Sequence, residues 1–191
     1  AKVPGCRLNI SHHKICGREN WGKSIQTLCL VDRAADEGVR VTLDVYPYTA
    51  SMTNLNVCLP QWFFANGPEK MQRLLRDPAV RRELIPEIME MDGRYRQCGG
   101  FENIMTAIAP NTPQACGYTI AKYANICGKE PFEAFFDLVA ENGHAALAIY
   151  FSMSEEDLQR ILLGRHTVLS SDSLIKNLEE TTHPRAFGSF P

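Results

Sequence analysis

Arg7-Leu8-Asn9-Ile10-Ser11-His12-His13-Lys14 joins a short extended run to two imidazoles and an ammonium group. In a strand, alternate side chains point to opposite faces, so only one of His12 and His13 can face a given pocket. Ligands and metals commonly bind at the carboxyl end of parallel strands. Two interpretations stay open at this point, a functional cluster or a structural histidine beside a solvated lysine.

The residues that follow predict a helix and then a second strand. Apolar residues at helical spacing predict a helix over residues 23–37, which ends at Gly38. The run 39–45 is β-branched and partly alternating, which is typical of a strand. Because strand, helix and strand follow one another closely, we expect an α/β fold with a parallel sheet covered by helices.

Two further strands are predicted to end at the same edge of this sheet. Pro47 cannot donate a hydrogen bond to a neighbouring strand, so Tyr46 and Tyr48 should lie at the carboxyl end of the second strand. The run 166–171 predicts a third strand, which delivers Asp172 to that edge. Imidazole and carboxylate suit metal-assisted hydrolysis, whereas lysine and tyrosine donors suit a substrate carboxylate or a developing oxyanion.

The chain divides into three predicted parts. We expect a βαβ portion over residues 1–59, a mainly helical insertion or lid over 60–143, and the last strands with a substrate loop over 144–191. The remaining predicted elements are helices over 68–76, 78–91 (broken or kinked at Pro86), 118–127 and 131–141, a short strand over 145–151, and a helix over 155–163 capped by Ser154.

Composition excludes several classes of function. The 191 residues include 20 Lys+Arg and 22 Asp+Glu, and a net charge of -2 provides no basic field for nucleic acid. No apolar run reaches the roughly 20 residues that span a bilayer. The 7 cysteines are an odd number without a C-x-x-C pair, which argues against a disulfide framework or a thiolate zinc site. We therefore expect a soluble, cytoplasmic protein.

Six runs of the sequence together resemble the N-acyl-D-amino-acid deacylases, the D-aminoacylases of the metal-dependent amidohydrolase superfamily. The runs are ISHHK (10–14), NWGKS (20–24), LDVYPYTAS (43–51), SMSEEDLQRIL (152–162), SSD (170–172) and HPRAFGSFP (183–191). They follow the family's order from end to end, and the resemblance weakens between residues 62 and 118.

This resemblance implies part of a TIM-like (β/α)8 amidohydrolase barrel, namely its sixth through eighth strands with a helical insertion. It implies zinc as the cofactor, with His12 as one metal ligand. It also implies that Asp172 is the general base on the zinc-bound water and then the general acid. Lys14, Tyr46 and Arg185 match residues that hold the carboxylate and carbonyl of the substrate.

The sequence departs from the family pattern at several positions. Residues 51–53 are SMT where the family usually has SST, and Ser173 follows Asp172 where glycine is common. Nothing matches the early His-x-His, the metal-bridging cysteine or the strand-five histidine, and Cys16 lies in a loop and is no substitute. We therefore expect a piece of a longer enzyme that binds zinc weakly or not at all alone, is inactive, and self-associates through uncovered surfaces.

The expected reaction is hydrolysis of the amide of a small-molecule N-acyl-D-amino acid to a carboxylate and a D-amino acid, without nucleic-acid or membrane partners. Two alternatives stay open. One is a cyclic-amide hydrolase of the hydantoinase or dihydroorotase type, which the DVYPY and HPR runs disfavour. The other is a non-catalytic helical module that binds a partner or a small ligand.

Overall fold

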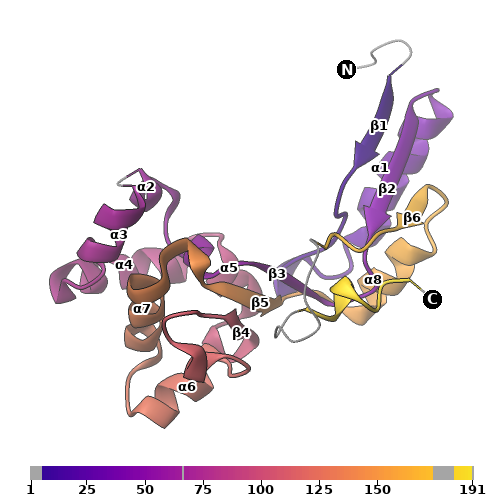
Figure 1. The fold of residues 1–191 in the computed structure, drawn as a ribbon. Helices are drawn as coiled ribbons and strands as arrows, with labels where there is room; N and C mark the ends of the chain where they lie inside the picture. Colours follow the sequence, from indigo (N-terminus) through magenta and orange to yellow (C-terminus); the bar gives the residue numbers. More distant parts are fainter. Residues whose placement is uncertain (1–5, 66, 174–182, 191) are drawn as a thin grey trace. The chain divides into compact units, whose positions relative to one another are not determined.

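The computed structural model describes residues 6–65, 67–173 and 183–190 (Figure 1). The chain divides into two compact units. Unit 1 comprises Ala1–Thr49, Met153–Glu180 and Pro184–Pro191, and unit 2 comprises Ala50–Ser152 and Thr181–His183. Unit 2 is longer at both ends than the helical insertion predicted over 60–143, because a strand beginning at Ala50 pairs with one ending at Phe151.

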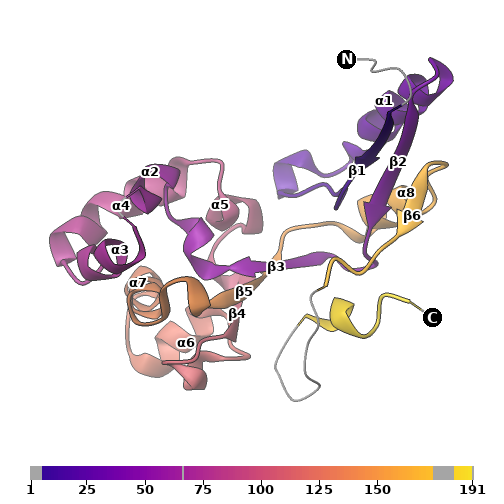
Figure 2. The same ribbon diagram turned by 45° about the horizontal axis from the view of Figure 1, so that its top comes forward.

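Unit 1 contains a three-stranded parallel sheet. Its strands are β1 (Arg7–Ile10), β2 (Arg40–Val45) and β6 (Thr167–Leu169), in the spatial order β1-β2-β6 (Figure 2). Ile10 pairs with Leu43, and Val45 pairs with Leu169, so the three carboxyl ends meet at one edge. Helices α1 (Ser24–Asp36) and α8 (Glu155–Leu162) precede β2 and β6 respectively. The predicted α/β fold and parallel sheet are confirmed.

Alternation along β2 separates the two faces of this sheet. Val41, Leu43 and Val45 are buried and pack against apolar side chains of α1 and α8. Burial of each such side chain contributes about 1.5–3 kcal/mol. Thr42 and Asp44 lie on the opposite, polar face. In the described part of unit 1, both helices thus cover one face, which is typical of a βα-barrel rather than a doubly wound sheet.

Unit 2 combines a small antiparallel sheet with six helices in its described residues. The strands are β3 (Ala50–Asn54), β4 (Ile104–Ile108) and β5 (Leu147–Phe151), in the order β3-β5-β4. The helices are α2 (Gln61–Phe64), α3 (Pro68–Leu74), α4 (Pro78–Glu90), α5 (Arg94–Cys98), α6 (Ile120–Cys127) and α7 (Pro131–Asn142). Stacked and tilted rings of Phe101, Phe135 and Phe136 lie in the core of this unit. None of the helices in the described residues is long and apolar enough to cross a membrane.

Two details of unit 2 correct the sequence-based prediction. The helix predicted to break at Pro86 continues through it as α4, because Leu84 and Ile88 on either side are buried and hold the backbone in place. Strands β3 and β4 were not predicted. The strand expected over 145–151 forms as β5, and its partners are these two strands rather than β2 or β6.

Candidate functional site

The loops at the carboxyl ends of β1 and β6 bring His12 and Asp172 together. The Nε2 atom of His12 lies 3.0 Å from Oδ1 of Asp172. Among the described residues, these two are the only non-glycine residues in the left-handed region, with φ of 56° for His12 and 51° for Asp172. This backbone conformation costs about 1–2 kcal/mol per residue, and such strain concentrates at functional sites.

Arg185 approaches the same carboxylate from the short 3₁₀ turn Pro184–Ala186. Its Nη1 donates to Oδ2 of Asp172 at 2.6 Å, and only 13% of the Arg185 side chain is exposed. Both oxygens of Asp172 therefore face nitrogen atoms of predicted site residues. The arrangement holds the carboxylate in one orientation beside the imidazole.

Tyr46, which directly follows β2, has two cations close to its ring. The Cζ atom of Arg185 is 5.0 Å from the centroid of the tyrosine ring, and Nζ of Lys14 is 5.1 Å from it. The negative face of an aromatic ring attracts such cations. Lys14, Tyr46 and Arg185, which the sequence predicts as substrate residues, are thus gathered next to Asp172.

The buried phenol of Tyr46 leads to a prediction about pH. Burial raises the pKa of Tyr46 to about 12, against the opposing effect of Arg185. Between pH 10 and pH 12 the unfolded chain releases this proton and the folded chain keeps it, so the free energy of unfolding falls as pH rises through this window. The absorbance titration of the wild type, after subtraction of the titration of Tyr46→Phe, should show one phenol that ionises near pH 12. A phenol ionising near pH 10 in that difference would contradict this.

Tyr48 forms a hydrogen bond with the segment that carries Arg185. Its hydroxyl donates to the carbonyl of Gly188 at 2.8 Å, and Oγ of Ser189 donates to the carbonyl of Arg185 at 2.9 Å. A Cβ atom at Gly188 would collide with the Tyr48 hydroxyl oxygen. Tyr48 had no role predicted from the sequence beyond its place at the sheet edge, and its contact with residue 188 is not visible in the sequence.

We expect Gly188→Ala to lower the free energy of unfolding by about 1–3 kcal/mol, because the added methyl group overpacks against Tyr48. Tyr48→Phe removes the oxygen with which it collides. The penalty of Gly188→Ala should therefore be smaller in the Tyr48→Phe background, as measured by denaturant unfolding of the four proteins. An equal penalty in both backgrounds would show that the collision is not its cause.

Asp44 on β2 is a second residue that sequence reasoning missed. Its carboxylate accepts from the backbone N–H of His12 at 2.8 Å and from Nδ2 of Asn9 at 2.7 Å. Burial acts to raise the pKa of Asp44, but the hydrogen bonds from His12, Asn9 and Ser11 outweigh it and lower the pKa. In the sequence, the only signal is an aspartate on the polar face of an alternating strand.

His13 contacts α1 rather than Asp172, because the chain turns at His12 after β1 has ended. Its Nε2 lies 3.0 Å from Oγ1 of Thr27 in α1. Burial, and then the charge of Lys14, lower the pKa of His13 and favour the neutral imidazole. The two imidazoles therefore have different partners, Asp172 for His12 and Thr27 for His13.

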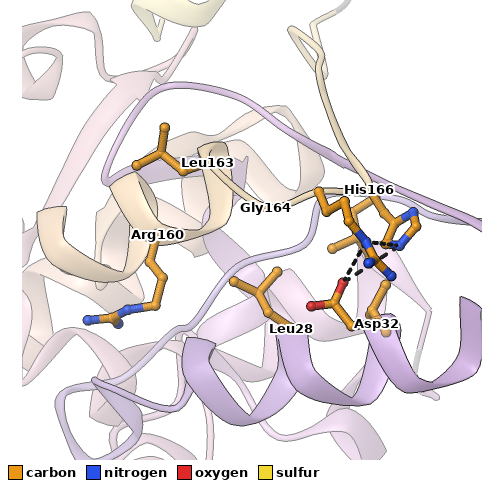
Figure 3. A pocket seen from close by; sticks show the side chains of 9 residues that line it. Leu28, Asp32, Arg160, Leu163, Gly164 and His166 are labelled. Atoms are coloured by element: carbon orange, nitrogen blue, oxygen red, sulfur yellow. Dashed lines mark hydrogen bonds and ion pairs between the residues drawn. The ribbon is translucent and has the colours of Figure 1, made fainter. Parts of the chain in front are cut away.

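A hollow of about 300 Å³ lies at the other end of β6 and contains none of the predicted site residues (Figure 3). Its apolar wall includes Leu28 and Leu163. At its rim, Asp32 lies 3.6 Å from His166 and 3.8 Å from Arg165. Because these polar groups already contact one another, the hollow shows no arrangement that suggests a reaction.

The donor set at the carboxyl edge fits only part of a zinc site. Imidazole nitrogen and carboxylate oxygen are both zinc ligands, and His12 and Asp172 supply one of each. A catalytic zinc usually has three protein ligands. Within residues 6–65, 67–173 and 183–190, no group of three or more His, Cys, Asp or Glu side chains could hold a metal ion.

Comparison with known proteins finds deacylases along nearly the whole chain, although no family model matches it. The chain is 30% identical to N-acyl-D-glutamate deacylase of Alcaligenes xylosoxydans xylosoxydans over 97% of its own length and 29% of that protein. It is 33% identical to the D-aminoacylase of the same organism over 95% of its length and 28% of that protein. The chain thus spans less than a third of these relatives.

Solved structures give the same result. The N-acyl-D-glutamate deacylase of Bordetella bronchiseptica, crystallised with zinc and a phosphonate mimic of the tetrahedral intermediate, matches 97% of this chain and 30% of its own. The TM-score is 0.64 and the identity 29%. A D-aminoacylase described as defining a novel subset of amidohydrolases matches 96% of this chain and 29% of its own, with a TM-score of 0.60 and 28% identity.

Proposed function

We propose, from the premise that this chain belongs to the D-aminoacylase family, that the protein containing it hydrolyses the amide bond of N-acyl-D-amino acids. The products are a carboxylate and a free D-amino acid. One observation carries the proposal: residues following three parallel strands, together with Arg185, gather at a single edge of the sheet. In α/β enzymes this edge is where substrates bind.

In this proposal Asp172 moves the proton. Its carboxylate takes a proton from the attacking water and returns it to the nitrogen of the leaving amine, so one group acts as base and then as acid. The contacts of Oδ1 with His12 and of Oδ2 with Arg185 support this role, because a general base must be held within reach of the proton that it takes.

Lys14, Tyr46 and Arg185 bind and orient the substrate in this proposal. The free carboxylate of an N-acyl-amino acid and the developing oxyanion both need donors or cations. The two cations beside the Tyr46 ring provide such a region next to Asp172. Because the Tyr46 phenol keeps its proton to about pH 12, it can donate a hydrogen bond over the whole working range.

His12 would hold zinc as one of its ligands. When bound, zinc polarises the scissile carbonyl and lowers the pKa of a coordinated water. The imidazole nitrogen of His12, 3.0 Å from Asp172, fits this use, and a zinc-bound relative supports it. The described residues contain no group of three potential ligands, so we propose that other parts of the longer protein provide the further ligands.

The fold supports a matching proposal for the architecture. We place β1, β2 and β6 as the sixth, seventh and eighth strands of a (β/α)8 barrel. Their parallel order and the helices on one face of the sheet support this placement. The polar face of β2 would then point to the interior of the barrel. We expect the 191 residues alone to be inactive, because the residues that the structure describes supply only part of a metal site.

Substrate choice tests the proposed function. N-acetyl-D-methionine, its L-enantiomer and a hydantoin should be offered to the longer protein and to the 191-residue chain. We expect turnover of the D-substrate by the longer protein only. Preferential turnover of the hydantoin would support a cyclic-amide hydrolase instead. Tight stoichiometric zinc and deacylase activity in the 191-residue chain would contradict the incomplete site.

A further inference from the structure

We infer that Asp44 is a positioning residue, which fixes the turn after β1 and thereby aims the His12 imidazole at Asp172. The effect of Asp44 on catalysis rests on the proposed function. Its effect on the conformation of His12 does not, because it concerns hydrogen bonds within this chain. The two parts can therefore be tested separately.

Asp44 accepts two hydrogen bonds from the turn and one from the end of β1. Oδ1 accepts from the backbone N–H of His12 at 2.8 Å, and the backbone carbonyl of Asp44 accepts from the N–H of His13 at 2.8 Å. Oδ2 accepts from Nδ2 of Asn9 at 2.7 Å. Pairing between β1 and β2 ends at Ile10. The Asp44 carboxylate thus provides the acceptor for His12 beyond the last paired residue.

The neighbours of Asp44 fix the direction of its carboxylate. Thr42 donates its hydroxyl to Oδ1 of Asn9 at 2.8 Å, so the Asn9 amide group must present its NH2 to Asp44 and to Ser11, which lies 3.0 Å away. Thr42, Asn9 and Asp44 form one polar row across the paired strands. Because each oxygen of Asp44 accepts from a defined donor, an asparagine at this position would have to set its NH2 group against either the His12 N–H or the Asn9 NH2 group.

The turn that Asp44 holds separates the two histidines. With φ of 56°, His12 presents Nε2 to Asp172 at 3.0 Å, while His13 presents its ring to Thr27. A histidine released from the left-handed region would move its ring relative to Asp172. Loss of an outer-shell partner of a metal ligand typically costs about 10–100-fold in metal affinity or activity. Asp44 would be such a partner, acting through the backbone rather than the ring.

The structural part can be tested in this chain by amide hydrogen exchange. In Asp44→Ala, the His12 amide should exchange at least about tenfold faster, since it loses a hydrogen bond to a charged acceptor. The Leu43 amide, which donates to the carbonyl of His166 at 2.8 Å, reports whether the sheet is intact. Asp36→Asn is a matched control, because it removes a carboxylate bonded to Arg165 without touching the turn.

An unchanged His12 amide with a protected Leu43 amide would overturn the inference. If the Leu43 amide also loses protection in Asp44→Ala, the same two amides are compared in the isosteric variant Asp44→Asn. In the longer protein, Asp44→Asn should lower zinc affinity about 10–100-fold, with kcat falling more than KM changes. If the wild type is active and Asp44→Asn keeps its zinc affinity and kcat, the inference about Asp44 is overturned and the proposed function stands. If the longer wild-type protein is inactive but the His12 amide exchanges faster in the Asp44 variant, the proposed function is overturned and the conformational part of the inference stands.

Discussion

Asp172→Asn is expected to lower kcat for N-acyl-D-amino acid hydrolysis by about 10²–10⁴-fold, the contribution typical of a general acid–base. The amide has the size of the carboxylate but cannot take a proton from water. Zinc content should stay at the wild-type level, because the proposed function assigns zinc binding to His12 and only proton transfer to Asp172. The measurements are amine release under saturating substrate and elemental analysis of the purified longer protein. Asp36→Asn, which removes an exposed carboxylate paired with Arg165, should leave both values unchanged.

A separate substitution keeps this result interpretable, because Asp172 also accepts from Arg185. If the asparagine variant acted only by releasing Arg185, then Arg185→Ala would reproduce its effect. We expect a different pattern: Arg185→Ala should raise KM more than it lowers kcat, since a residue that binds the substrate carboxylate contributes to ground-state binding. Near-normal kcat in Asp172→Asn would remove Asp172 from the mechanism.

The second large effect is expected for His12. His12→Ala should lower the zinc affinity of the longer protein by more than about 100-fold, beyond the loss typical of an outer-shell partner. Alanine keeps the Cβ atom, so the left-handed strain at this position persists and the variant isolates the imidazole. Zinc per protein, measured by elemental analysis after dialysis, checks this expectation.

His13→Ala is the matched control for this variant. It removes the neighbouring imidazole, whose partner is Thr27 rather than Asp172. We expect His13→Ala to retain zinc and to affect mainly the packing of the turn on α1. Equal loss of zinc in both variants, or full retention in both, would contradict the division of roles between the two histidines.

Much of this edge of the sheet was predictable from the sequence. The strand patterns around Ile10, Val45 and Leu169 are local, and parallel strands necessarily bring their carboxyl ends to one edge. The sequence predicted that His12 and His13 diverge, but by strand alternation, whereas they diverge through the left-handed turn at His12 after β1 has ended. These inferences need only residue order and the period of a strand.

Other features depend on contacts that sequence order does not show. The left-handed turn at His12 depends on Asp44, which lies 32 positions further along the chain. The packing of Tyr48 against Gly188 joins residues 140 positions apart. Strands β3 and β4 were missed for the same reason, because these five-residue segments are strands only through their pairing with β5. Pro86 continues its helix because of burial, which overrides local preference.

The central claim is that Lys14, Tyr46, Asp172 and Arg185 form one binding edge for the reacting amide and its carboxylate. Calorimetric titration of the longer protein with a phosphonate analogue of the tetrahedral intermediate tests it most directly. We predict that Lys14→Ala, Tyr46→Phe and Arg185→Ala each weaken binding by about tenfold or more, the value of a hydrogen bond to a charged group. Binding that is tight in the wild type and unchanged in all three variants would contradict the claim.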